Sequence, residues 1–137
     1  MNITLRAGEK LYINGAVIRV DRKATIELLN DVTVLLENHV MQADQATTPL
    51  RQIYFAVQVM LMDPGATAVA TTLTRRLMES AQKAFENPLI LAGLNTIAGQ
   101  IERGRNFEAL KALRALFPLE EKEMYPNGKP AKTPEAA

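Results

Sequence analysis

The fold is decided near the start of the chain by the stretch LYINGAVIRV, residues 11–20. Within it, Asn14-Gly15 separates two short apolar runs. This pair favours a type I′ turn, because both central positions of that turn need a positive φ. The stretch therefore predicts a β-hairpin with strands over residues 11–13 and 16–20.

The same short alternation extends outward from the hairpin. Ile3 and Leu5 alternate with Thr4 and Arg6, and further apolar runs lie at residues 25–29 and 32–36. Polar turns at residues 7–10, 21–23 and 30–31 separate these runs. Five short strands in 36 residues predict a small antiparallel sheet or half-barrel. Because successive side chains of a strand face opposite sides, Arg6 should point away from the apolar face of Ile3 and Leu5.

The periodicity becomes helical after a polar connector at residues 37–47. Thr48-Pro49 is a helix start, since Thr can cap free amides and Pro suits the first helical position. A helix over residues 49–62 should stop at Asp63-Pro64-Gly65. It is apolar nearly all round, which is typical of a helix buried on several sides by its own chain or by a partner. The candidate partner-binding residues on it are Tyr54, Met60 and Met62.

Three more helices are predicted. The first covers residues 66–85, with an inward stripe formed by Val69, Leu73, Leu77, Ala81 and Ala84 or Phe85. The second starts at Asn87-Pro88 and runs to about residue 103, where Gly104 ends it. The third covers residues 107–117 and closes at Pro118. The fold class is therefore α+β, with a β-rich unit at residues 1–47, a helical bundle at 48–117 and a flexible tail at 118–137.

The composition makes an enzyme the least favoured class. The 137 residues include no cysteine, which excludes disulfides and thiolate metal sites, and only one histidine, His39. No glycine-rich phosphate loop or nucleophile elbow occurs, and Ser80 stands inside a helix stripe. We expect no cofactor or metal, an ordinary surface or hydrogen-bonding role for His39, and a solvated acidic run at residues 120–123. No apolar stretch is long enough to span a bilayer and the start is unlike a signal peptide, so we expect a cytoplasmic protein.

Basic side chains of the β-rich unit are the candidate RNA-binding residues. With 16 basic and 15 acidic residues the net charge is only +1, so any attraction to nucleic acid must be local. RNA recognition combines cations that hold phosphates with aromatic rings that stack on bases. The alternative is an ordinary solvated sheet face with interspersed acids, which charge alone favours. The candidate residues are Arg6, Lys10, Tyr12, Arg19, Arg22 and Lys23.

Three blocks of the chain resemble the FlbT family of flagellar regulators: LRAGEKLYINGAVI at residues 5–18, TIELLN at 25–30 and QATTPLRQIY at 45–54. The resemblance covers most of residues 3–117. It implies a post-transcriptional regulator of flagellum biogenesis that associates with the 5′ leader of flagellin mRNA and represses translation or promotes decay. It also implies a functional relation with a FlaF-like protein.

A second resemblance concerns ITLRAGE at residues 3–9 together with Leu11 and Ile13-Asn14-Gly15. These residues are similar to the opening strands of CsrA-type RNA-binding regulators, which pair as strand-swapped dimers and grip RNA with arginines. That family has two adjacent arginines before the turn, whereas this chain has Leu5-Arg6, so only Arg6 matches. The resemblance implies a homodimer as an option for this chain.

Two hypotheses follow. In the first, the sheet cations hold leader phosphates, Tyr12 stacks on a base, and ribosome entry is blocked or a nuclease is admitted. In the second, the protein acts through a FlaF-like or chaperone partner held by the helices, without direct RNA contact. Salt dependence separates them, because phosphate binding weakens steeply with salt and apolar docking does not.

Overall fold

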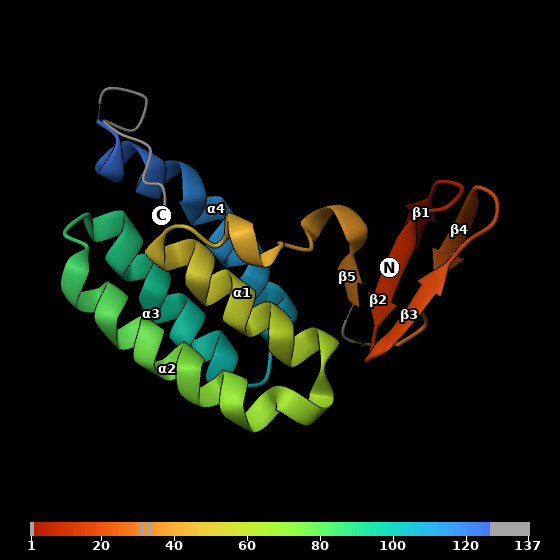
Figure 1. Ribbon diagram of the computed structural model, residues 1–137, viewed down its shortest axis with the longest axis horizontal. Coiled ribbons are helices and arrows are strands. Elements are labelled where there is room, and N and C mark those ends of the chain that lie inside the picture. Colours follow the sequence, from red (N-terminus) through yellow and green to blue (C-terminus); the bar gives the residue numbers. More distant parts are fainter. Residues whose placement is uncertain (1, 31, 33, 127–137) are drawn as a thin grey trace.

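The computed structural model describes residues 2–30, 32 and 34–126, and it has the expected α+β architecture. Five strands come first and four helices follow, with short 3₁₀ turns between them (Figure 1). The strands are β1 Asn2–Leu5, β2 Lys10–Ile13, β3 Ala16–Arg19, β4 Ala24–Glu27 and β5 Val34–Leu36. The 3₁₀ helices are η1 Glu37–His39, η2 Ala43–Gln45 and η3 Pro64–Ala66, and the α-helices are α1 Pro49–Met62, α2 Thr67–Ala84, α3 Pro88–Glu102 and α4 Asn106–Met124.

The strands form two antiparallel sheets and not the single sheet that the alternation predicted. β1 pairs with β4 in one sheet, and the order in the other is β3-β2-β5. The predicted hairpin is confirmed, with φ of 52° at Asn14 and 85° at Gly15. The chain passes between sheets at the turn after Leu5, which lets both inner faces bury apolar side chains. The predicted turn at residues 30–31 lies partly outside the described residues.

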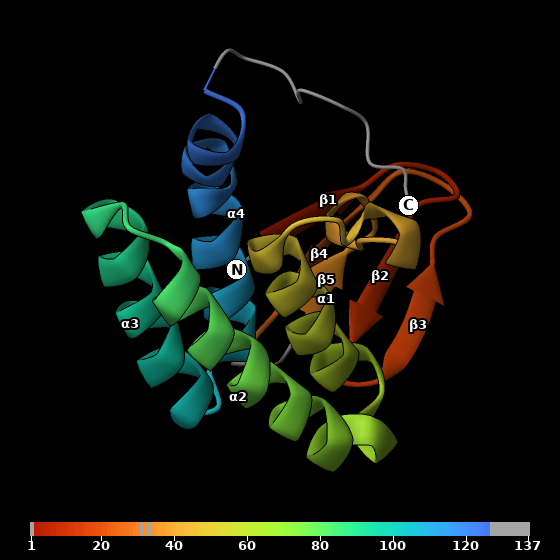
Figure 2. The ribbon, with the colours of Figure 1, turned by 60° about the vertical axis from the view of Figure 1, so that its left-hand side comes forward.

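The three-stranded sheet lies between the two-stranded sheet and the helices (Figure 2). Leu11 of β2 packs with Ile3 and Leu5 of β1 in a small apolar cluster. Tyr12, the next residue, faces the opposite way and packs against the main helical core. Strand alternation therefore gives β2 two apolar faces, one for each neighbouring layer.

Helix α1 is the central helix of the fold, the hub helix. This position explains why its sequence is apolar nearly all round. It packs against both α2 and α4, and eight of its fourteen residues are buried. Thr48 caps it by accepting a hydrogen bond from the Arg51 amide at 3.2 Å. Its own chain buries Tyr54 and Met60, and Met62 is half-buried. Tyr54 and Met60 therefore pack within the chain, and their binding of a partner stays a prediction.

The connector at residues 37–47 is tied to α1 by specific polar contacts. The Gln58 side chain bonds both backbone groups of Met41, accepting from its N–H at 2.6 Å and donating to its carbonyl at 2.8 Å. The Tyr54 hydroxyl donates to the His39 carbonyl. These bonds satisfy buried polar groups and hold the β-rich part against the helices.

The inward face of α2 differs from the predicted stripe. Ala70, Thr74, Met78 and Ala81 are buried, whereas Val69 is 75% exposed and Leu73 is 44% exposed. Of the predicted stripe, Ala81 and Phe85 are buried, Leu77 is half-buried and Ala84 is exposed. The helix has two candidate inward faces one residue apart, and the one that is buried where α2 packs against α1 carries Ala70, Thr74 and Met78.

Helix α4 continues through Pro118 to Met124, so neither the predicted stop at residue 117 nor a tail from residue 118 is correct. Proline has no N–H, so one helical hydrogen bond is missing at Pro118. Because Pro118 is exposed, this missing bond lies on the solvent side of the helix. Beyond it, Glu120 is completely buried, which also corrects the prediction of a solvated acid at this position. The predicted tail over residues 127–137 lies outside the described residues.

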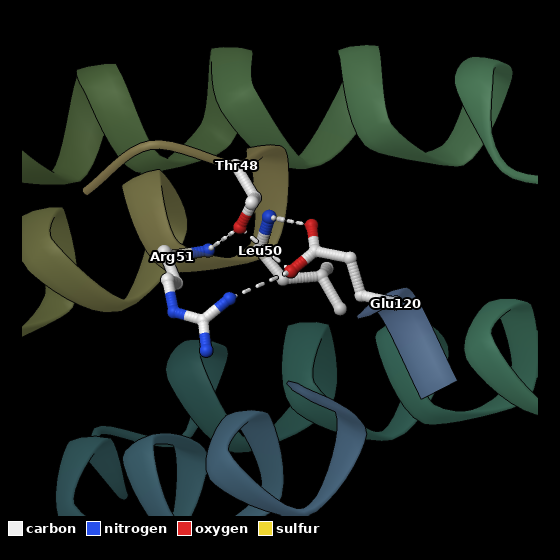
Figure 3. Close-up of polar contacts among 4 residues, drawn as sticks. All are labelled: Thr48, Leu50, Arg51 and Glu120. Carbon is white, nitrogen blue, oxygen red and sulfur yellow. Dashed lines mark hydrogen bonds and ion pairs between the residues drawn. The ribbon is translucent and has the colours of Figure 1, made fainter. Parts of the chain in front are cut away.

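The buried Glu120 carboxylate joins the end of α4 to the start of α1 (Figure 3). It accepts hydrogen bonds from the Thr48 hydroxyl at 2.6 Å and from the Leu50 N–H at 2.8 Å. Arg51 approaches it at 3.8 Å. A carboxylate is favoured at a helix N-terminus, where free N–H groups carry partial positive charge.

Candidate functional site

The fold gathers the five predicted RNA-binding cations at one end of the β-rich part, which we call the cationic end. It comprises Arg6, Lys10, Arg19, Arg22 and Lys23. Lys10 and Arg19 are directly opposite in the β2–β3 ladder. Arg6 follows Leu5 and Lys23 precedes Ala24, and Leu5 and Ala24 are paired in the β1–β4 ladder.

Two backbone contacts close the cationic end. The Gly8 amide donates to the Val20 carbonyl at 2.7 Å, and the Val20 amide donates to the Glu9 carbonyl at 3.4 Å. These bonds join the turn after β1 to the end of β3, so they bring residues 6–10 beside residues 19–23. Gly8 has a φ of 83°, a conformation that glycine adopts without strain.

Like charges directly opposite on a ladder are destabilising, so the Lys10–Arg19 pair carries a cost that an anion would relieve. Among the described residues, Arg22 is the only member of the cationic end that forms an ion pair; it lies 3.6 Å from Asp21, and both side chains are 85% exposed. Glu9 and Glu37 also lie there, but each accepts from a backbone amide, of Arg6 at 2.8 Å and of Lys10 at 2.7 Å. Their carboxylates are thus partly engaged by the main chain.

Arg6 points outward as strand alternation predicted, since Ile3 and Leu5 are buried and Arg6 is exposed. Tyr12 is placed differently from the cations. It is half-buried and its ring packs against the main helical core. The ring thus already has a packing partner within the chain.

A second polar centre, which the sequence analysis missed, surrounds Tyr54. Its hydroxyl donates to the His39 carbonyl and accepts from the Arg114 guanidinium at 2.9 Å. Burial raises the pKa of the Tyr54 hydroxyl, although Arg114 acts in the opposite direction. Burial and the nearby Arg114 charge lower the pKa of His39. Arg114 lies 60 residues from Tyr54 in sequence, so no local pattern could have paired them.

His39 is half-buried and supplies a backbone acceptor, while its buried Nδ1 atom has no hydrogen-bond partner among the described residues. In the part of the chain that the structure describes, no group of three or more metal-ligating side chains comes together. Over the same residues, no helix is both long enough and apolar enough to cross a membrane.

The fold and the cationic end define an α+β protein whose strand layer presents clustered positive charge. The chain belongs to the FlbT family, because the family model described as "Flagellar protein FlbT" matches residues 1–124.

Curated relatives agree with this assignment. The chain is 52% identical over 122 residues to the "Probable flagellum biosynthesis repressor protein FlbT" of Agrobacterium fabrum, covering 89% of this chain and 82% of that protein. It is 51% identical over 127 residues to the protein of the same name from Mesorhizobium japonicum, covering 93% and 86% respectively. A third relative of that name, from Chelativorans sp., is 51% identical over 119 residues, covering 87% and 82%. No solved structure matches the chain.

Proposed function

We propose that the protein is a post-transcriptional repressor of flagellum biogenesis that binds the 5′ leader of flagellin mRNA through its cationic end. The repressor role is supported by the names of relatives that share about half of their residues with this chain. Direct RNA contact is supported by one observation above the others, the opposed Lys10–Arg19 pair beside exposed Arg6, Arg22 and Lys23.

In this mechanism the cations hold successive leader phosphates. Phosphate contacts position a protein on RNA but carry little sequence information, so selectivity comes from the shape or unpaired bases of the leader. The bound protein then blocks ribosome entry or exposes the message to a nuclease. Because Tyr12 packs against the helical core, the proposal depends on the cations and not on base stacking by that ring.

The test is binding of the purified, nuclease-treated full chain to labelled flagellin leader RNA at two salt concentrations, with a scrambled leader beside it. Arg6→Ala and Arg22→Ala should weaken binding and reduce the slope of log affinity against log salt by about 0.7 for each lost phosphate contact. Arg76→Ala, an exposed arginine on α2, is the matched control and should bind like the unaltered protein. Wild-type affinity and salt slope in both sheet variants would refute the cationic end as the RNA site.

A second candidate function is regulation through a FlaF-like or chaperone protein partner without RNA contact. The observation that favours it is the exposed apolar surface on α2, where Val69 and Leu73 lie together in an open pocket. Val69→Ser and Leu73→Ser would then abolish regulation in cells and leave leader binding unchanged. Apolar docking would also persist at high salt, unlike phosphate binding.

A further inference from the structure

A pocket separate from the apolar patch lies where the connector meets α1 and α4, and we call it the arginine pocket. It is open to solvent and has a volume of about 430 Å³. Its polar side chains come from Arg51 of α1, Arg114 of α4, and Asn38, His39 and Gln45 of the connector. This size is within the range of small-ligand sites, roughly 300–1,000 Å³.

The two guanidinium groups of the arginine pocket are held by aromatic rings. Arg51 lies 4.6 Å from the Phe117 ring centroid, and Arg114 lies 5.9 Å from the Tyr54 ring centroid. The two rings contact each other, with centroids 5.6 Å apart. These contacts between guanidinium groups and rings restrict both arginine side chains before a ligand binds. The loss of side-chain entropy on binding is therefore smaller.

The charge of the arginine pocket is not balanced from within. Among the described residues no carboxylate lines the pocket, and the ion pair between Arg51 and Glu120 is long, at 3.8 Å, because that carboxylate accepts two shorter hydrogen bonds elsewhere. Within the described residues Arg114 has no carboxylate partner and donates only to the neutral Tyr54 hydroxyl. Of the two half-buried cations that line the pocket, Arg114 therefore has no anion among the described residues, and Arg51 has only the 3.8 Å contact with Glu120.

The number of donors favours a phosphate over a carboxylate. Two arginines, Asn38 and Gln45 line one pocket. One Arg114 N–H donates to Tyr54 and the Gln45 Oε1 accepts from the Gln42 amide, but the remaining N–H groups of these four side chains outnumber what the two oxygens of a carboxylate can accept. A phosphate ester has more terminal oxygens and more charge, and arginine binds it with charge-assisted hydrogen bonds. Val40 and Met41 add an apolar wall that suits a sugar or base.

We propose that the arginine pocket binds the phosphate group of a ribonucleotide, either a free mononucleotide or a residue of an RNA chain. The pocket adjoins the cationic end, because Asn38 lines both it and the open pocket formed by Arg6, Gly8, Glu9 and Glu37. An RNA strand on the cationic end would therefore reach the arginine pocket past Asn38. The site itself does not require that the cationic end binds RNA.

The test is calorimetric titration of the full chain with adenosine 5′-monophosphate, inorganic phosphate, adenosine and citrate, with amide NMR to locate the response. We expect saturable binding of the two phosphate compounds, with shifts at residues 38–41 and 114–117. Adenosine and citrate should be far weaker. Binding of adenosine or citrate as tight as that of the monophosphate, shifts confined to other residues, or no saturation at millimolar ligand would overturn the proposal.

Variants separate a ligand role from a folding role. Arg114→Gln should weaken the monophosphate about tenfold or more, since it removes a charge-assisted donor. Asn38→Asp is a second variant, because Asn38 is exposed and the new charge should repel phosphate without disturbing packing. Arg76→Gln on α2 is the matched control and should bind normally. Wild-type affinity in both Arg114→Gln and Asn38→Asp would overturn the site.

The source of the phosphate is decided by competition with a short leader RNA. Displacement of bound monophosphate by RNA identifies an RNA residue as the ligand, whereas independent binding identifies a free nucleotide, and both support the site. Arg6→Ala distinguishes this proposal from the proposed function. Loss of leader binding with intact monophosphate binding in that variant assigns the two ligands to different surfaces.

Discussion

The Glu120 carboxylate accepts a hydrogen bond from the Leu50 N–H at 2.8 Å, across 70 residues of sequence. It thereby supplies α1 with a second capping group beside Thr48, from a helix at the other end of the chain. Because Glu120 is completely buried, water does not reach its carboxylate. Water therefore cannot replace that carboxylate as the acceptor for the Leu50 N–H and the Thr48 hydroxyl. The first prediction concerns the loss of this acceptor.

Glu120→Ala should lower the free energy of unfolding by about 2–5 kcal/mol, because it leaves two buried donors without partners. Glu120→Gln keeps one acceptor oxygen and should lose less, about 1–2 kcal/mol. Urea denaturation followed by circular dichroism measures both. Glu121→Ala, on the exposed side of α4, is the control and should stay within about 0.5 kcal/mol. Equal stability of Glu120→Ala and the unaltered protein would contradict the capping role.

Stability should also depend on the protonation of Glu120. Burial raises the pKa of this carboxyl above its ordinary value of 4.5, against the opposing effect of its hydrogen bonds with Thr48 and Leu50. The folded state then binds the proton more tightly than the unfolded state, so this group's contribution to stability decreases as pH rises from 4.5 through the raised pKa. The advantage of the unaltered protein over Glu120→Gln should therefore be larger at the acid end of that window than at neutral pH. A difference that is constant or increases with pH would contradict this sign.

Two glycines of α3 should respond to alanine in opposite directions. A Cβ at Gly93 would lie 2.8 Å and 2.9 Å from the two Leu116 methyl groups, so Gly93→Ala overpacks the α3–α4 contact and should cost about 1–3 kcal/mol. The described atoms nearest to a Cβ at Gly99 belong to the end of the flexible Arg103 side chain, at 3.3 Å. Gly99→Ala should gain about 0.5–1 kcal/mol from helix propensity. Thermal unfolding of the two variants checks the pair, and equal effects would contradict the close approach at Gly93.

The turn between β2 and β3 should be sensitive to a contact with the helical part. Gly15 and Gly8 share a positive φ, 85° and 83°, so alanine is strained at both. At Gly15 a Cβ would also lie 3.2 Å from the Pro64 ring, whereas at Gly8 no atom of the described residues lies within 4 Å. Gly15→Ala should therefore be the more destabilising of the two, by up to about 1 kcal/mol. Chemical denaturation compares them, and a larger loss for Gly8→Ala would show that the Pro64 contact is unimportant.

The inward face of α2 makes a further prediction. Met78→Ala should cost about 2–4 kcal/mol because Met78 is buried in the main core, and Leu73→Ala should change stability by less than about 0.5 kcal/mol. Both are apolar truncations on one helix, so propensity effects are similar. If Leu73→Ala proved the more damaging, the predicted stripe and not the observed one would face the core.

Signals that act over a few residues predicted their elements well. Asn14-Gly15 forms the expected turn, Thr48 caps α1, and Asn87 caps α3 by accepting from the Leu89 amide at 2.8 Å. Gly104 ends α3 with a φ of 74°. In each case the physical cause is a local φ or a side chain that reaches a neighbouring amide, and neither needs knowledge of the rest of the fold.

Features that depend on distant residues were missed. The face of α2 is chosen by α1, and the sequence of α2 alone offers Leu73 as readily as Met78. Pro118 predicted a helix end because the cost of proline inside a helix can be read from the sequence. The compensating hydrogen bond between the buried Glu120 and Leu50 cannot be read from it. The same limit applies to the candidate site. Strand alternation predicted the outward Arg6, but only the paired ladders bring it beside residues 19–23, and only the tertiary fold brings Arg114 to Tyr54.

The Glu120–Leu50 hydrogen bond has a consequence for the order of events during synthesis. At a translation rate of roughly 5–20 residues per second, the ribosome needs about 4–14 s to pass from Leu50 to Glu120. During that interval Thr48 alone caps the first turn of the nascent α1. The two helices that cover its apolar faces, α2 and α4, are not yet both synthesised. Until α4 has been synthesised, the face of α1 that packs against it stays uncovered, and exposed apolar surface of this kind makes an incomplete chain prone to aggregation.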